Sequence, residues 1–252
     1  MEKNKKRTVI LVHGMRGSSY GFIEIERLLQ KDFRVHNLDL PGTGGNPELE
    51  KQDLNGHVEW LRSYVDGLKE KPVVVGHSMG SIIVSHYVAK YPESVADDVV
   101  LLSPIVRQTT NKILSTASYG AANGILAPFP LKYRKKILAS KPVSWMISHY
   151  LTADRSKQRE IDEMHYVNGR QFVSARSLQG DLRVSVVNQT REPSGKRTLV
   201  LFGQKDRLSS HKVVREWAKR VSVEYHEFEG AGHLINHERP TEVAKRIKRF
   251  LG

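Results

Sequence analysis

The first part of the chain alternates between short apolar runs and longer segments with helical periodicity. The runs are rich in β-branched residues, which is typical of strands buried on both faces of a parallel sheet. Leu54, Val58, Leu61, Val65 and Leu68 recur at steps of three or four and therefore share one face of a helix. Strand–helix units repeated at this spacing predict a parallel sheet with right-handed crossovers.

The same patterns extend along the rest of the chain, except for a long helical stretch between the fourth and fifth strands. The expected strands are 8–12, 33–38, 72–75, 99–102, 198–202 and 223–228. The expected helices are 18–30, 54–68, 81–91, 111–125, 131–140, 143–151, 156–168, 172–187, 212–221 and 241–251. We therefore predict an α/β core formed by residues 1–103 and 197–252, with a helical insert over 104–196.

Composition and charge narrow the choice of function. The chain has no cysteine, which removes disulfides, thiolate nucleophiles and cysteine-ligated metals. No apolar run approaches the ~18–20 residues of a membrane-spanning helix, and the apolar stretch 9–12 is too short for a signal-peptide core. We expect a soluble, cytoplasmic protein without a cofactor. The net charge of +13 is uneven, since residues 1–103 carry −1 and residues 104–252 carry +14.

One short motif carries candidate chemistry. Residues 76–80 read Gly-His-Ser-Met-Gly and match G-x-S-x-G, between an apolar strand and a predicted helix. Such a turn is too tight for side chains two residues either side of the serine, and it lifts the Ser78 hydroxyl above the sheet. A serine hydroxyl is a poor nucleophile and needs a base within hydrogen-bond reach. His233 is the best candidate, because it lies in a glycine-rich loop after the last strand, at the edge where such sheets place catalytic groups.

Three further motifs accompany the serine turn. Residues 13–18 read His-Gly-Met-Arg-Gly-Ser, residues 39–44 read Asp-Leu-Pro-Gly-Thr-Gly, and residues 230–233 read Gly-Ala-Gly-His. With these motifs the chain resembles the α/β-hydrolase family over essentially its whole length, in its serine esterase and lipase-like branch. The resemblance implies a helical cap where the insert falls. Many family members have two extra strands at the start, which we expect to be absent here, so that 33–38, with its exposed Arg34 and His36, becomes an edge of the sheet.

The family's chain order, serine then acid then histidine, implies that Asp206 is the acid. Asp206 follows the strand 198–202, and its role would be to orient His233 and stabilise its charged form. The alternatives are Asp181 or Asp154 as the acid and His237 as the base.

The remaining motif residues have supporting roles in this hypothesis. The backbone N–H groups of Met15 and Met79 would form the oxyanion hole. His13 is expected to organise the oxyanion loop, Asp39 to bond within its own loop, and the Ser81 hydroxyl to bond back to the backbone. The spacing of His233 and His237 is metal-like, but the glutamate and helix of a zinc site are missing, so no metal is expected.

A serine nucleophile indicates acyl transfer to water, whereas attack on an sp³ carbon would need a carboxylate. We therefore predict hydrolysis of a small or lipid-like carboxylic ester, with other acyl transfer (thioesterase, acyltransferase or carbon–carbon hydrolase) as the alternative and ligand binding without catalysis as a third. The basic clusters 132–136 and 245–249 are expected to be solvated helix faces. No nucleic-acid motif accompanies them. The charge suits an anionic substrate or membrane surface, but we expect it to serve solubility.

Overall fold

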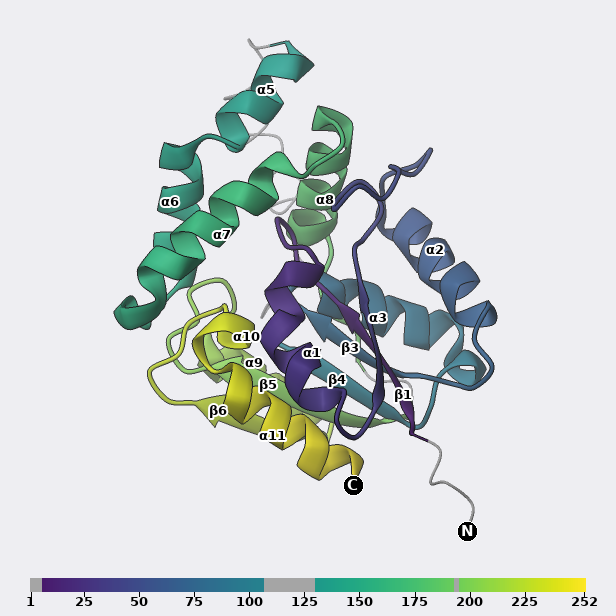
Figure 1. Cartoon of the computed structure of the whole chain (residues 1–252). Helices are drawn as coiled ribbons and strands as arrows, with labels where there is room; N and C mark the ends of the chain where they lie inside the picture. Colours follow the sequence, from purple (N-terminus) through teal and green to yellow (C-terminus); the bar gives the residue numbers. More distant parts are fainter. Residues whose placement is uncertain (1–5, 107–129, 193–194) are drawn as a thin grey trace.

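Six parallel strands form the centre of the protein in a computed structural model that describes residues 6–106, 130–192 and 195–252 (Figure 1). The strands are β1 Thr8–Val12, β2 Arg34–Leu38, β3 Val73–His77, β4 Asp98–Leu102, β5 Arg197–Gly203 and β6 Glu224–Phe228. Their order is β2-β1-β3-β4-β5-β6, and each neighbouring pair runs parallel. The predicted sheet is confirmed, and β3 extends beyond its predicted end to His77, next to the serine turn.

Helices cover both faces of the sheet, because the strand residues that point to one face and those that point to the other are both apolar. Val9 and Leu11 share one core with α1 and α11, whereas Ile10 and Val12 share the other with α2, α3 and α9. The first group of helices is η1 Ser19–Phe22, α1 Ile23–Leu29, α10 Ile235–Glu238 and α11 Pro240–Leu251. The second is α2 Leu54–Asp66, α3 Met79–Lys90, η2 Pro92–Ser94 and α9 His211–Arg220.

The edge strands differ from the central ones. β2 lies at one edge of the sheet, as predicted, and its burial runs from an exposed Arg34 to a buried Leu38. Arg34 pairs with Glu70 at 3.4 Å. His36 was expected to be exposed but is half-buried, because its Nδ1 is hydrogen-bonded to the Tyr64 hydroxyl at 2.7 Å.

Among the described residues, four helices and a short 3₁₀ turn lie between β4 and β5 in the chain, above the end of the sheet that carries the serine turn (Figure 1). We call α5, α6, α7 and α8 the inserted helices. They are α5 Leu131–Leu138, α6 Lys141–Leu151, η3 Arg155–Lys157, α7 Gln158–Arg170 and α8 Ala175–Val187. The helix predicted over 111–125 falls outside the described residues. Within the described parts of the chain, no helix is long and apolar enough to cross a membrane.

Candidate active site

Ser78 lies on a strained turn between β3 and α3. Its backbone has φ 53° and ψ −116°, in the left-handed half of the map that a residue with a Cβ rarely adopts. A Cβ at Gly76 would lie 2.4 Å from the Gly80 oxygen, and a Cβ at Gly80 would lie 2.2 Å from the Val12 oxygen. Both glycines of the motif are therefore required sterically. The Ser81 hydroxyl donates to the Gly76 carbonyl at 2.6 Å, the expected bond to the backbone.

A continuous hydrogen-bonded chain joins three of the predicted residues. His233 Nε2 lies 2.8 Å from Ser78 Oγ, and His233 Nδ1 lies 2.7 Å from Asp206 Oδ2. The other carboxylate oxygen of Asp206 accepts backbone N–H bonds from Leu208 at 2.8 Å and Ser209 at 3.1 Å. All three side chains are buried. A carboxylate fixed at one end of the imidazole leaves the other nitrogen directed at the serine, which is the geometry of a base and its nucleophile.

The loop that carries His233 is held by the inserted helices as well as by the sheet. The His233 N–H donates to the Leu151 carbonyl at the end of α6 at 2.8 Å. The buried carboxylate of Glu238 accepts the Gly232 N–H at 3.0 Å and two further amides from the segment after α6. Glu238 was not singled out from the sequence, although it follows His233 by only five positions. It fixes the histidine loop against the inserted helices.

The alternative acids and base lie elsewhere. Asp181 Oδ1 is 3.0 Å from His57 Nε2, and Asp154 pairs with Arg239 at 2.5 Å. His237 is buried, and desolvation lowers its pKa to about 4. Over the described ranges no group of three or more His, Asp and Glu side chains is arranged to hold a metal ion. Of the candidates, only His233 and Asp206 are therefore brought to Ser78.

His13 and Asp39 fix the loops around the site. His13 Nδ1 lies 2.8 Å from the Gly14 oxygen, while its Nε2 accepts the Leu40 N–H at 3.0 Å. This pattern suits a neutral imidazole, and burial lowers its pKa accordingly. Asp39 was expected to bond within its own loop, but its side chain accepts the Ser19 N–H at 2.6 Å. It therefore joins its loop to the start of η1.

The two candidate oxyanion donors lie on either side of the serine. Met79 is the first residue of α3, where backbone amides have no acceptor within the helix. Met15 follows Gly14, whose Cβ, if present, would lie 3.0 Å from the Ser78 Cβ. The absence of a side chain at Gly14 therefore lets this loop approach the serine closely.

A cavity of about 500 Å³ opens beside Ser78 and His233. Loops at the carboxyl end of the sheet form one wall, and α6 and α8 form the other. Its lining is largely apolar, which suits an acyl chain or another apolar group. The apolar lining residues are Met15, Ile105, Met146, Ile147, Tyr150, Leu151, Leu182, Val186, Leu208 and Leu234.

Arg16 also lines the cavity, and nothing in the sequence indicated its role. Its guanidinium is buried and donates to the Leu138 oxygen at 2.7 Å, to Ser144 Oγ at 2.8 Å and to the His165 oxygen at 3.3 Å. These acceptors lie on or at the end of α5, α6 and α7, so one side chain links the loop of Met15 to three inserted helices. Desolvation lowers the pKa of Arg16 to about 10. A Cβ at Gly169 would lie 2.6 Å from Arg16 Nη2, so this close packing needs a glycine.

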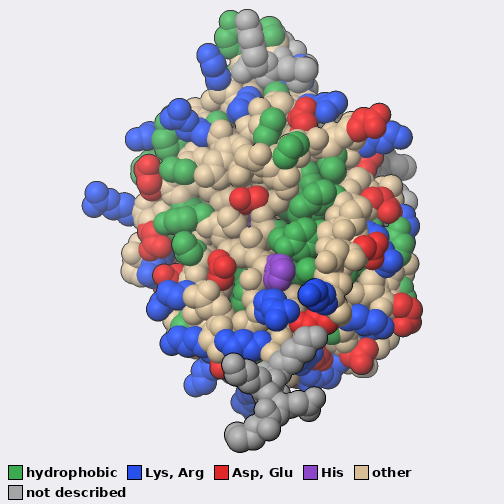
Figure 2. All heavy atoms as spheres, turned by 45° about the vertical axis from the view of Figure 1, so that its right-hand side comes forward, with side chains coloured by type: hydrophobic (Ala, Val, Ile, Leu, Met, Phe, Trp, Pro, Cys, Tyr) green, Lys and Arg blue, Asp and Glu red, His purple; other side chains and the backbone are tan. Residues whose placement is uncertain are grey.

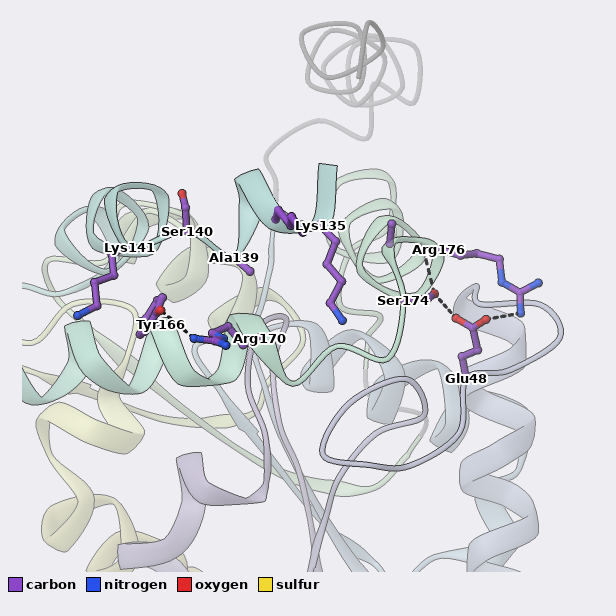
Figure 3. A pocket seen from close by; sticks show the side chains of 11 residues that line it. Glu48, Lys135, Ala139, Ser140, Lys141, Tyr166, Arg170, Ser174 and Arg176 are labelled. Atoms are coloured by element: carbon purple, nitrogen blue, oxygen red, sulfur yellow. Dashed lines mark hydrogen bonds and ion pairs between the residues drawn. The ribbon is translucent and has the colours of Figure 1, made fainter. Parts of the chain in front are cut away.

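A second cavity, of about 1090 Å³, lies between α5, α7 and α8, and shares no lining residue with the cavity beside Ser78. Figure 3 shows Lys135, Lys141 and Arg170 around it, with Arg176 paired to Glu48 at 2.9 Å. Lys and Arg side chains predominate among the charged residues that line this cavity, which lies on the outer part of the inserted helices. On the face shown in Figure 2, Lys and Arg side chains are interspersed with Asp and Glu.

The fold and the site together define a class of protein, namely an α/β sheet protein with a strained serine turn next to a histidine and a carboxylate. The model of the Alpha/beta hydrolase family matches residues 9–246, and the chain belongs to this family.

Curated relatives and solved structures are similar over most of the chain. A cis-3-alkyl-4-alkyloxetan-2-one decarboxylase of Shewanella oneidensis is 24% identical, with 96% of this chain and 81% of the relative covered. The monoacylglycerol lipase ABHD6 of Mus musculus is also 24% identical, with 98% and 76% covered. A thermophilic esterase from Thermogutta terrifontis superposes with a TM-score of 0.76 at 19% identity, with 98% and 90% covered. At that identity the structural likeness concerns the fold.

Proposed function

We propose that the protein is a serine hydrolase that cleaves carboxylic esters through an acyl-enzyme, with Ser78 as nucleophile, His233 as base and Asp206 as the orienting acid. The observation that carries the proposal is the hydrogen-bonded chain Ser78–His233–Asp206 at the wall of an apolar cavity. Esterases and monoacylglycerol lipases among the similar proteins support ester substrates.

The geometry suits a two-step reaction. His233 Nε2 takes the Ser78 proton as the hydroxyl oxygen attacks the ester carbonyl, and the N–H groups of Met15 and Met79 stabilise the resulting oxyanion. His233 then protonates the leaving alcohol. In the second step a water, deprotonated by the same imidazole, releases the acid from Ser78.

The inserted helices have a defined part in this proposal. We propose that residues 104–196 form a cap that excludes water from the ester and shapes the cavity, on a core formed by 1–103 and 197–252. The apolar lining favours acyl chains or lipid-like esters over strongly polar ones.

Replacement of the nucleophile tests the function. Ser78→Ala should lower kcat/KM for a chromogenic ester by roughly 10⁴- to 10⁶-fold. Ser63→Ala, on the exposed face of α2, is the matched control and should retain full activity. Retention of activity in Ser78→Ala would refute the assignment, provided that both variants melt at the temperature of the wild type.

A substrate panel then measures the depth of the cavity. Matched esters and thioesters with acyl chains of two to about sixteen carbons give chain length and leaving group together. A cavity of about 500 Å³ predicts that kcat/KM rises with chain length while methylenes fill it and then levels off.

A further inference from the structure

Helix α6 buries polar side chains and exposes large apolar ones. The side chains of Ser144 and Ser148 are fully buried, while Trp145 is 58%, Met146 65% and Tyr150 48% exposed. A helix on a protein surface normally turns its apolar stripe inward and its polar face outward. In α6 two serines face the protein, while three large apolar side chains remain largely exposed and Ile147 and Leu151 are half-buried.

The two buried serines are hydrogen-bonded to charged side chains. Ser144 Oγ accepts a hydrogen bond from the buried Arg16, and Ser148 Oγ hydrogen-bonds the Asp162 carboxylate on α7. Because these serines satisfy the buried Arg16 and the half-buried Asp162, their side of the helix is polar, and Trp145 is left exposed. Contiguous exposed apolar surface of this kind marks an interaction site.

This surface is continuous with the candidate active site. Met146 and Tyr150 line the cavity beside Ser78, and so does Leu208, which is 48% exposed. We call Trp145, Met146, Tyr150 and Leu208 the apolar rim. Anything that covers the apolar rim therefore also covers the opening through which a substrate reaches Ser78.

Positive charges flank the apolar rim. Lys141 begins α6, one turn before Trp145, and its ammonium lies 5.1 Å from the centre of the Tyr166 ring (Figure 3 shows both side chains). On the other side, exposed Arg207 precedes Leu208, and its carbonyl accepts the Tyr150 hydroxyl. Neither Lys141 nor Arg207 is ion-paired with a carboxylate among the residues that the structure describes.

Two carboxylates lie near the rim. Asp162 and Glu163 line a groove beside Trp145. Asp162 is hydrogen-bonded by Ser148 and Gln158 and lies 3.4 Å from His149 Nδ1. Its charge is therefore directed into the protein. Glu163 is exposed in the groove, but Lys141 and Arg159 line it as well, so the outward-facing charges there are predominantly basic.

We propose that the apolar rim docks on the surface of an anionic lipid bilayer, with Trp145, Met146, Tyr150 and Leu208 inserted at the headgroup level. Trp and Tyr favour this layer because each has an apolar body and a polar tip. Flanking Lys and Arg add attraction to anionic headgroups. Docking brings the mouth of the cavity against the lipid, so that a lipid ester can reach Ser78 without crossing water. This consequence rests on the proposed function.

Vesicle binding tests the docking directly. Vesicles of phosphatidylcholine with about a third phosphatidylglycerol should co-sediment with the protein, and pure phosphatidylcholine should bind it less. Trp145 is the most exposed of the three tryptophans, because Trp217 is 5% exposed and Trp60 is half-buried. Insertion should therefore shift the tryptophan emission to the blue, and brominated lipids should quench it.

Two single replacements separate the rim from the rest of the surface. Trp145→Ser should weaken vesicle binding by roughly tenfold or more, since about half of a large side chain loses its burial in lipid. Ile23→Ser removes an apolar side chain that is 50% exposed on α1 and is the matched control, with unchanged binding. Turnover of a dispersed short-chain ester should be the same in both variants, because neither residue lines the cavity beside Ser78.

Three results would overturn the docking proposal. The first is absence of binding to both kinds of vesicle, and the second is equal loss of binding in Trp145→Ser and Ile23→Ser. The third is a dimer in solution that Trp145→Ser dissociates, because a second copy would then cover the rim. Binding is measured with Ser78→Ala as well. If that variant binds vesicles while the wild type hydrolyses no ester, docking stands and the proposed function fails.

Discussion

Asp206→Asn is the sharpest test of the candidate site, because the surroundings of Asp206 fix which way the new amide would point. One carboxylate oxygen accepts the N–H groups of Leu208 and Ser209, and the other faces His233 Nδ1. An asparagine that keeps the two backbone bonds must present its NH₂ group to His233. The imidazole proton then moves to Nε2, and that nitrogen can no longer accept the Ser78 proton.

The size of the effect follows from the cost of turning the amide over. The flipped amide would place NH₂ against two backbone donors and leave two N–H groups, one buried and one part-buried, without an acceptor. Each such loss costs about 1–3 kcal/mol, so the productive orientation lies about 2–6 kcal/mol above the unproductive one. At 1.36 kcal/mol for each factor of ten, we expect kcat to fall by roughly 10²- to 10⁴-fold.

The assay is steady-state hydrolysis of a chromogenic ester at a pH well above the pKa of an ordinary imidazole. Asp154→Asn is the matched control, because this carboxylate is the alternative acid and is paired with Arg239 instead. It should leave kcat within a few-fold of the wild type. A fall of less than tenfold in Asp206→Asn, with an unchanged melting temperature, would show that Asp206 does not orient His233.

Two further predictions concern stability. Gly169→Ala should lower the free energy of unfolding by about 1–3 kcal/mol, since its Cβ would lie 2.6 Å from the Arg16 guanidinium. Gly67→Ala is the control, because the nearest contact of its Cβ would be at 3.4 Å, and it should leave the free energy of unfolding unchanged. Urea denaturation measures both. Buried His165 and His237 have pKa values lowered to about 3 and about 4, below those of the unfolded chain. The unfolded chain therefore binds more protons, and stability should be complete above pH ~6.5 and fall towards pH ~4. His237→Gln should reduce this acid sensitivity in melting curves, and an unchanged slope would contradict the reasoning.

The fold was predictable because its core depends on local patterns. Short apolar runs rich in β-branched residues predicted the four central strands, alternation of apolar and polar residues predicted the edge strand 33–38, and turn glycines identified loops. The strand ends were less certain, since β3 continues through Gly76 and His77, which the apolar run does not include. Tertiary pairing with β4, in which His77 is opposite Leu102, extends the strand beyond its own propensity.

The candidate site was predictable where a motif has a fixed spacing, or where the family's chain order points to a strand end, as it does for Asp206. Ser78 and His233 stand in glycine-rich turns whose geometry is set by neighbours in the chain. The contacts of Arg16 are different, because its partner Ser144 is 128 positions away. No periodicity in either segment indicates such a pairing. The sequence did not predict the exposed apolar face of α6 for the same reason. Contacts with Arg16 and Asp162 determine which side of that helix is buried.

These distant contacts have a consequence for how the inserted helices act. Leu151 at the end of α6 holds the backbone of His233, and Ser144 on the same helix holds Arg16, next to Met15. One helix therefore contacts both the loop of the candidate base and the loop of a candidate oxyanion donor, while its outer face forms most of the apolar rim. A displacement of α6 on docking would change both loops together.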